Sequence, residues 1–278
     1  MQCNNDISDN KIELLTYLLQ TYHKFVFYDS IISIIKARDF FSIKMLFMMI
    51  SDVLMCILDD YKFDDKMIKK YKKNADEVID IYLNKDSNFD NALKESIQHI
   101  FKDKALKENS IQLLLREKLF IENLQKFIIA YNQLHKYANG TLSDLLTEFH
   151  NSMSHIIAAL LHVQQVGQIL PVYSRNIEKA IGHLKRGRKD AYKIIIRCLY
   201  PIISQYSNVL DEFKKEFIII RCNEIDSLSD VEKHETVENS IQNIAEKYLQ
   251  KLIINNTIEN QEKFKDELNS FFLYKMKV

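Results

Sequence analysis

Glycine and proline are scarce in this chain, and their scarcity limits the folds that it can adopt. The 278 residues include only four glycines and two prolines. Tight turns between strands need glycine, proline or Asn-Gly pairs, whereas helices need little beyond capping residues at their ends. Apolar residues make up 47% of the sequence, which is enough for a hydrophobic core. The sequence therefore predicts an all-α protein, a multi-helix bundle without a sheet.

Helical periodicity recurs along almost the whole chain and predicts about nine helices. Asn139-Gly140 interrupts the pattern, and a second interruption runs from Gly167 to Pro171. Pro201 falls inside an expected long helix and should kink or split it. The expected helices cover residues 9–37, 39–59, 64–84, 89–108, 110–138, 141–165, 174–221, 230–254 and 257–275.

The distribution of charge suggests both a domain boundary and a region for an anionic partner. Residues 101–200 contain 15 basic and 8 acidic side chains, whereas the segments before and after them contain more acidic than basic ones. We expect a boundary near residues 84–110, between an N-terminal bundle over 1–100 and a second bundle over 101–278, with one continuous domain as the alternative. The excess of positive charge in the middle favours a partner that carries phosphate groups.

Cysteine usage and the apolar segments favour a soluble cytoplasmic protein. The four cysteines are scattered without a metal-type spacing, so a disulfide framework or zinc finger is not expected. The most apolar segment, residues 40–58, is interrupted by Lys44 and Asp52, and a buried core helix explains it better than a membrane span. A glycine-rich phosphate loop is absent, and the aspartates between 59 and 65 are interpreted as helix caps. The sequence thus indicates neither a cofactor nor a metal site.

The expected helix over residues 141–165 has an apolar face and a polar face. On a helical wheel, Phe149 centres an apolar stripe, and a polar line runs on nearly the opposite side. Small residues beside this polar line favour close packing with another helix, from the same chain or from a second protomer. The polar line consists of Glu148, Asn151, His155 and His162, and Ala158 and Ala159 flank it.

The segment Glu148-Phe149-His150-Asn151-x-x-x-His155 resembles the signature of the HEPN superfamily. These proteins are small helical bundles, and they include metal-independent ribonucleases and toxins of bacterial defence systems. The family motif places an arginine, a polar residue, a short spacer and a histidine on one helix. Asn151 and His155 match this pattern, and His150 occupies the arginine position.

The resemblance implies a role for each of these residues. His155 would act as the acid or base in RNA cleavage, Asn151 would orient it or the phosphate, and His150 would replace the arginine. Because histidine holds a phosphate less firmly than arginine does, this substitution is expected to weaken or abolish cleavage. A metal-independent ribonuclease and a non-cleaving relative therefore both remain open.

A one-sided cationic row follows in the segment 174–199. Six basic side chains lie within about 80° of one another on the helical wheel, and they are Arg175, Lys179, Arg186, Lys189, Lys193 and Arg197. Asn176, His183 and Asp190 form a second line next to this row. We expect these three residues and His162 to lie where helices pack against each other. Like charges in a row repel one another, and the phosphates of RNA or a nucleotide would relieve that repulsion. The alternative is that acidic side chains from the ends of the chain cover the row.

These features together predict a protein that binds RNA or another phosphate-bearing partner and does not associate with a membrane. The HEPN resemblance adds a setting in phage defence or a toxin–antitoxin module, and it favours a homodimer. The competing hypothesis is a non-enzymatic interaction protein, which oligomerises or binds a protein partner through its helix seams.

Overall fold

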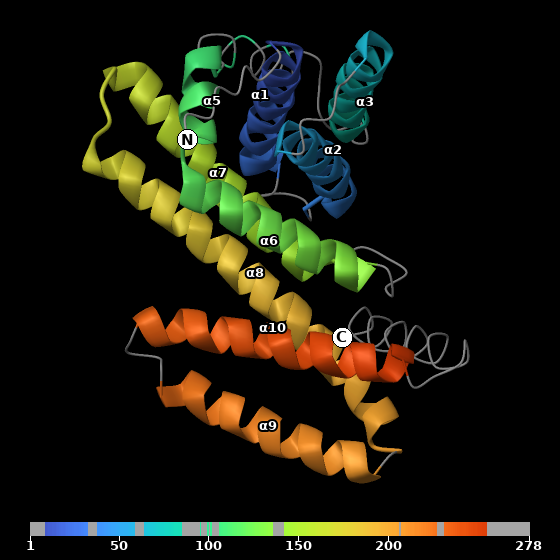
Figure 1. The fold of residues 1–278 in the computed structure, drawn as a ribbon. Coiled ribbons are helices and arrows are strands. Elements are labelled where there is room, and N and C mark those ends of the chain that lie inside the picture. Colours follow the sequence, from blue (N-terminus) through green and yellow to red (C-terminus); the bar gives the residue numbers. More distant parts are fainter. Residues whose placement is uncertain are drawn as a thin grey trace. The chain divides into compact units, whose positions relative to one another are not determined.

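The computed structural model describes residues 9–32, 38–58, 64–84, 95, 99, 101, 106–135, 142–205, 207–226 and 231–254. Within these ranges the chain forms nine α-helices and no strand (Figure 1), so the predicted all-α class is confirmed. Two compact units divide the chain: unit 1 comprises residues 1–125 and 146–184, and unit 2 comprises residues 126–145 and 185–278. The predicted boundary near residues 84–110 falls inside the sequence range of unit 1.

The central helix of unit 1 is α1 (Asp9–Ile32), which packs against α2 (Phe40–Leu58), α3 (Asp65–Asn84) and α5 (Glu108–Leu115). Its apolar residues recur at spacings of three and four, which places them on one side of the helix. These side chains are almost completely buried, and they include Leu14, Leu15, Leu18, Leu19, Tyr22 and Phe25.

Aromatic rings join four helices in the core of unit 1. The ring of Tyr22 on α1 meets the ring of Phe149 edge-on at 5.6 Å between centroids. Phe47 of α2 lies 4.6 Å from the same Phe149 ring, and Phe25 lies 4.9 Å from Tyr82 of α3. Phe149 belongs to α7 (Ser143–Val166), whose residues from 146 onward lie in unit 1. The aromatic core therefore sets the orientation of α7, and with it the histidines of the motif.

Helix α2 is apolar enough and long enough to cross a membrane, which among the described residues holds for this helix alone. The window Phe40–Ile57 has a mean hydropathy of 1.9, and 56% of it is buried inside the protein. A core helix of a globular protein meets the same criteria of length and composition. The expectation that the chain acts without a membrane stays a prediction.

Two helices replace the single helix expected over residues 110–138. Helix α5 ends at Leu115, and α6 (Lys118–His135) begins three residues later. Neither glycine nor proline marks this break. Instead, the hydroxyl of Tyr173, from the start of α8, donates a hydrogen bond of 2.9 Å to the carboxylate of Glu117 between the two helices. The break is thus associated with a contact to a residue 56 positions away, which local sequence does not reveal.

Helix α8 (Pro171–Ile203) carries the predicted cationic row and starts three residues before Ser174, where the sequence suggested a cap. Proline suits the first turn of a helix because its missing N–H has no partner there in any case. The turn before it contains Gly167, whose φ of +73° is the left-handed conformation that often ends a helix. After Pro201 the chain leaves α8 at Ile203 and enters α9 (Ser207–Asp226), so the expected split near this proline is confirmed.

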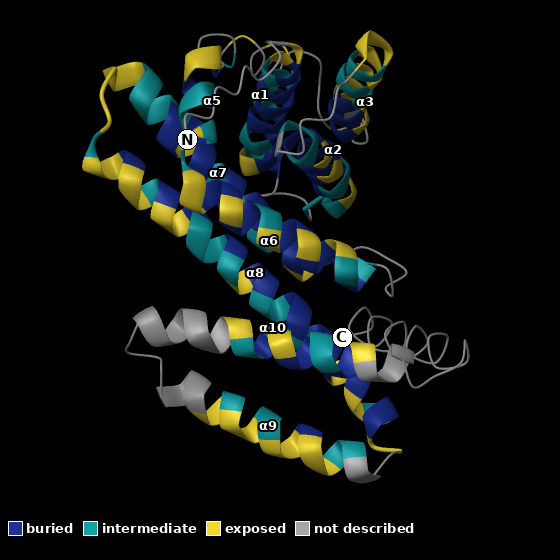
Figure 2. Cartoon of the chain, viewed as in Figure 1, coloured by how far each residue is buried: buried dark blue, intermediate teal, exposed yellow. Residues whose placement is uncertain are grey.

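In unit 2, α9 packs against α10 (Val231–Ile254), and the rings of Phe213 and Tyr248 meet edge-on at 5.0 Å. Lys247 of α10 forms ion pairs with Glu212, at 3.0 Å, and with Glu216. The outer side of α9 is exposed along much of its length (Figure 2), and Ile218 and Ile219 are each 60% exposed there.

Candidate functional site

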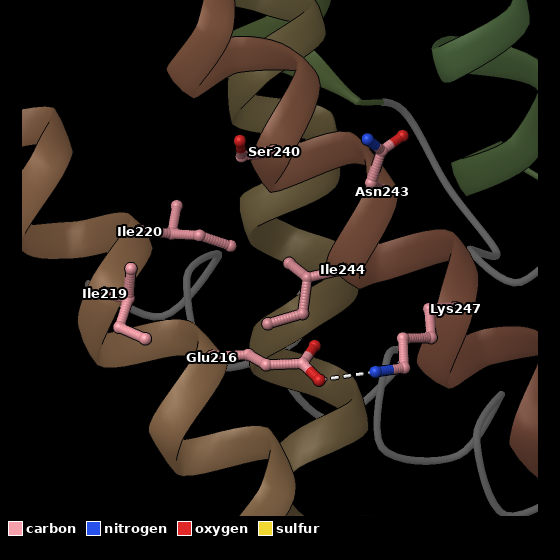
Figure 3. A pocket seen from close by; sticks show the side chains of 7 residues that line it. All are labelled: Glu216, Ile219, Ile220, Ser240, Asn243, Ile244 and Lys247. Atoms are coloured by element: carbon pink, nitrogen blue, oxygen red, sulfur yellow. Dashed lines mark hydrogen bonds and ion pairs between the residues drawn. The ribbon is translucent and has the colours of Figure 1, made fainter.

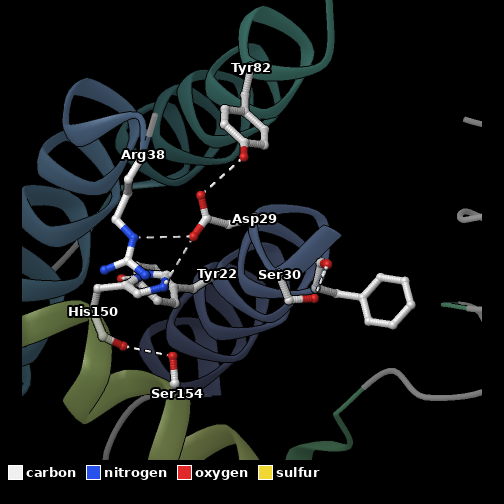
Figure 4. Close-up of polar contacts among 8 residues, drawn as sticks. Tyr22, Asp29, Ser30, Arg38, Tyr82, His150 and Ser154 are labelled. Carbon is white, nitrogen blue, oxygen red and sulfur yellow. Dashed lines mark hydrogen bonds and ion pairs between the residues drawn. The ribbon is translucent and has the colours of Figure 1, made fainter. Parts of the chain in front are cut away.

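His150 lies in the interior of unit 1, in contact with a buried polar cluster (Figure 4). The hydroxyl of Tyr22 lies 3.1 Å from its Nδ1 atom, and the Oδ2 atom of Asp29 lies 3.6 Å from its Nε2 atom. Burial, together with the positive charge of Arg38, lowers the pKa of His150 to about 3. Its ring is therefore neutral at pH 7, with Tyr22 donating to Nδ1 and Nε2–H directed at Asp29.

Asp29 is the centre of this cluster. It accepts a hydrogen bond of 3.1 Å from the hydroxyl of Tyr82 and forms an ion pair with Arg38 at 3.4 Å. Burial raises the pKa of the Asp29 carboxyl, while Arg38 opposes that shift. The side chains of Asp29 and His150 are only 3% and 5% exposed. No phosphate of a bound RNA reaches such an atom in the folded unit, so we leave His150 out of the candidate site.

The polar lines of α7 and α8 meet each other inside unit 1. The Nδ1 atom of His155 lies 3.0 Å from the Oδ1 atom of Asn176. The Nδ1 atom of His183 lies 2.7 Å from the Oε2 atom of Glu148. The two imidazole rings stack at 5.4 Å between centroids, with 22° between their planes. Two lines that the sequence identified separately thus form one seam, which we call the histidine seam (Glu148, His155, Asn176 and His183).

The remaining seam residues occupy different surroundings. Asn151 is half-buried one turn before His155 on α7. His162 is half-buried two turns after it, and its Nε2 atom is buried without a hydrogen-bond partner among the described residues. Asp190 lies in unit 2, where its negative charge acts on Lys193. The histidine seam therefore unites His155, Asn176 and His183, while Asp190 belongs to another part of the protein.

The six predicted cations divide between the two units. Arg175 and Lys179 lie in unit 1, and both are exposed. The other four lie in unit 2, where Arg186 and Arg197 are exposed and Lys189 and Lys193 are half-buried.

In unit 2 the cations of α8 are joined by Arg221 of α9. Burial and the nearby charges of Lys189, Arg221 and Arg197 lower the pKa of Lys193 to about 8, and Asp190 opposes this shift. We call these four residues the cation cluster (Lys189, Lys193, Arg197 and Arg221). Arg221 could not be found from the sequence, because its proximity depends on how α9 folds back after Pro201.

Gly182 is a second residue that the sequence did not single out. It follows Lys179 by three residues on α8 and precedes His183 directly. A Cβ atom built at this position would meet nothing within 4 Å, so open space adjoins the helix here. A small side chain at this position, directly beside His183, would therefore meet no neighbour.

Unit 2 also contains an open groove of about 290 Å³ between α9 and α10 (Figure 3). Its walls combine isoleucines with the Glu216–Lys247 ion pair and two small polar side chains. The lining residues are Glu216, Ile219, Ile220, Ser240, Asn243, Ile244 and Lys247. Among the residues that the structure describes, no three His, Cys, Asp or Glu side chains are grouped so that they could hold a metal ion.

Comparisons of the chain with protein-family models, with curated proteins and with solved structures found no match. Function is therefore inferred from the side chains and their contacts.

Proposed function

We propose that this protein binds RNA, or another partner with several phosphates, through the basic side of α8. The observation that carries the proposal is the cation cluster in unit 2, where two helices bring four positive side chains to one place. Burial, and after it this concentration of positive charge, lowers the pKa of Lys193 to about 8. Bound phosphates would favour the charged form of Lys193 and reduce the repulsion among its neighbours.

Phosphate contacts of this kind bind without reading base sequence. Arg186, which also lies in unit 2, is exposed and adds a further positive charge on α8. Both arginine and lysine bind phosphate well, arginine through two parallel hydrogen bonds and lysine as a point charge. A flexible polyanion such as single-stranded RNA suits these cations, because its backbone can follow them.

The histidine seam supports this proposal over the alternative of a protein partner bound through the helix seams. His155 and His183 each have a partner on the facing helix, Asn176 and Glu148 respectively. A second protein would have to break these contacts to use the same surface.

The resemblance of α7 to the HEPN motif supplies the proposed biological setting. We place RNA binding in a cytoplasmic, dimeric HEPN-like protein of a bacterial defence or toxin–antitoxin module. Asn151 and His155 on one helix support this placement. The interior position of His150 indicates that any cleavage would not depend on a cation at that position.

The test is the salt dependence of RNA binding, measured by fluorescence anisotropy with a labelled single-stranded RNA. If the four residues of the cation cluster each contact a phosphate, affinity should fall about 50-fold between 50 and 200 mM salt. A Lys193→Gln/Arg197→Gln variant should bind about 10-fold or more weakly at 50 mM and should show a shallower salt dependence.

The matched control is Lys69→Gln/Lys70→Gln, which removes two exposed positive charges from α3 in unit 1. It should bind RNA almost as the wild type does. The proposal fails if the wild type retains no RNA at 50 mM salt, or if the control weakens binding as much as the α8 variant.

A further inference from the structure

Helix α2 is apolar on both of its sides, although only one side lies in the core of unit 1. The core side includes Ile50 and Val53, which are at most 1% exposed. On the opposite side, Phe41 is 53% exposed and Met48 is 44% exposed. Two further methionines lie within about 60° of Met48 on the helical wheel, and both are half-buried. We call these outer residues the methionine stripe (Phe41, Met45, Met48 and Met55).

The first half of α3 is rich in lysine, with five lysines between residues 66 and 73. Lys72 forms an ion pair with Glu13 of α1. Lys66 and Lys70, in contrast, are exposed and form no ion pair with any residue that the structure describes. The fold therefore leaves the positive charges of Lys66 and Lys70 to the solvent or to a partner.

The methionine stripe and these two lysines lie on the same face of unit 1. Helices α1, α2 and α3 each pack against the other two, and α2 and α3 both carry exposed residues on their outer sides (Figure 2). The hydroxyl of Tyr71 on α3 donates a hydrogen bond of 3.0 Å to Asp52, an exposed residue beside the stripe on α2. Lys72 is turned about 100° from Tyr71 toward α1, and Lys70 is turned about 100° the other way, with Lys66 next to it. The stripe and the two lysines therefore both face away from α1.

An apolar stripe beside unpaired lysines fits the surface of an anionic lipid bilayer. Apolar side chains on one side of a helix enter the boundary between headgroups and acyl chains, and lysines beside them attract anionic headgroups. Methionine is flexible and unbranched, so it adapts to a fluid partner. The stripe extends over about 21 Å of helix, and a bilayer can follow this length without a groove shaped to receive it.

From these observations we infer that unit 1 docks on anionic lipid bilayers through the methionine stripe, Lys66 and Lys70. Helix α2 then lies along the bilayer surface while its other side stays packed in unit 1. The sequence favoured burial of this helix over a membrane span, and for that reason predicted no association with a membrane. The structure shows a helix with one side in the core and one side exposed, which suits docking without crossing. Docking does not depend on the proposed RNA binding, because the cation cluster lies in unit 2.

The experiment sediments the full chain with lipid vesicles and measures the bound fraction. One set of vesicles contains phosphatidylcholine alone, and the other also contains about 30% phosphatidylglycerol, which is anionic. The wild type should bind the anionic vesicles about 20-fold or more strongly, because each lysine near such a surface contributes about 5-fold. High salt should weaken this binding, since it screens the attraction between exposed charges.

The first variant removes the two positive charges. Lys66→Gln/Lys70→Gln should bind the anionic vesicles about 25-fold more weakly than the wild type. The matched control is Lys107→Gln/Lys118→Gln, which removes two exposed positive charges from another part of unit 1. This control should bind the vesicles almost as the wild type does.

The second variant removes apolar side chains from the stripe. Phe41→Ser/Met48→Ser should bind the anionic vesicles about 10-fold or more weakly, because these side chains no longer enter the bilayer. The matched control is Leu119→Ser/Val166→Ser, which removes two exposed apolar side chains elsewhere on unit 1. It should bind as the wild type does. Circular dichroism and urea denaturation establish that each variant is folded.

The outcomes separate docking from the proposed RNA binding. Lys193→Gln/Arg197→Gln, which should weaken RNA binding, should leave vesicle binding unchanged. If this variant loses as much vesicle binding as Lys66→Gln/Lys70→Gln, the bilayer is bound by the cation cluster and the inference is overturned. Equal losses in a variant and its matched control also overturn it. Absence of binding to both kinds of vesicle overturns it as well, and leaves the stripe to a protein partner.

Discussion

Unit 1 contains two contacts between a histidine and a carboxylate, and each contact has one of its residues on α7. Their environments differ. His150 and Asp29 are 5% and 3% exposed, and two tyrosines and an arginine surround them. His183 and Glu148 are 16% and 22% exposed, beside an open side of α8. His150 and Glu148 are only two residues apart on α7. Burial distinguishes the two contacts, because the first is enclosed in the core and the second is partly exposed.

Removal of the two carboxylates should have unequal effects on stability. Asp29→Ala leaves the partly buried Arg38 and the hydroxyl of Tyr82 without their acceptor, and we expect it to lower the free energy of unfolding by about 3 kcal/mol or more. Glu148→Ala removes a more exposed partner and should cost less than about 1 kcal/mol. Urea denaturation followed by circular dichroism measures both, and similar losses would contradict the comparison.

Of the two histidines, the buried His150 should make the free energy of unfolding depend on pH. His150 has a folded pKa of about 3, whereas an unfolded histidine titrates near pH 6.5. Between these values the unfolded chain binds the proton and the folded chain does not, so stability is lost as pH falls. The free energy of unfolding should therefore decrease by up to about 1.4 kcal/mol per pH unit below pH 6.5.

The variant His150→Gln isolates this contribution. It removes the titrating group and keeps Asp29, whose raised pKa acts with the opposite sign. Urea denaturation between pH 7 and pH 5 should give a loss for the wild type that exceeds the loss for the variant by about 2 kcal/mol. Equal slopes in the two proteins would show that His150 is not held neutral in the folded state.

The smallest expected effect concerns the open side of α8. Gly182→Ala should raise the free energy of unfolding by about 0.5–1 kcal/mol, because alanine favours a helix and its Cβ atom meets nothing within 4 Å. Gly167→Ala is the matched control, since φ at Gly167 is +73° and alanine adopts this conformation at a cost of about 1 kcal/mol. Thermal unfolding of both variants should therefore give shifts of opposite sign.

The local sequence was sufficient to predict the fold class and the limits of several helices. The scarcity of glycine and proline predicted helices, and α2, α3 and α7 begin and end within two residues of their expected limits. The wheel of α7 also identified its core stripe, in which Phe149, Met153 and Ile156 are at most 1% exposed. These features depend on residue spacing along one helix, which the sequence shows directly.

Other features depend on residues that are distant in the sequence. The break between α5 and α6 is accompanied by the contact between Tyr173 and Glu117. Arg221 joins the cation cluster only because α9 returns toward α8. The motif at 148–155 likewise could not show that His150 faces a buried aspartate 121 positions earlier. No local pattern distinguishes such a histidine from one at a surface.

The sequence by itself determined that the chain is helical, that two polar lines run along α7 and α8, and that positive charge gathers on one side of α8. The helical repeat places side chains on faces, so these properties follow from spacing alone. Only the tertiary structure decided that the two polar lines pair with each other, that His150 is enclosed and that Gly182 adjoins open space. Burial and contact depend on which helices pack together, and packing joins residues that the sequence keeps far apart.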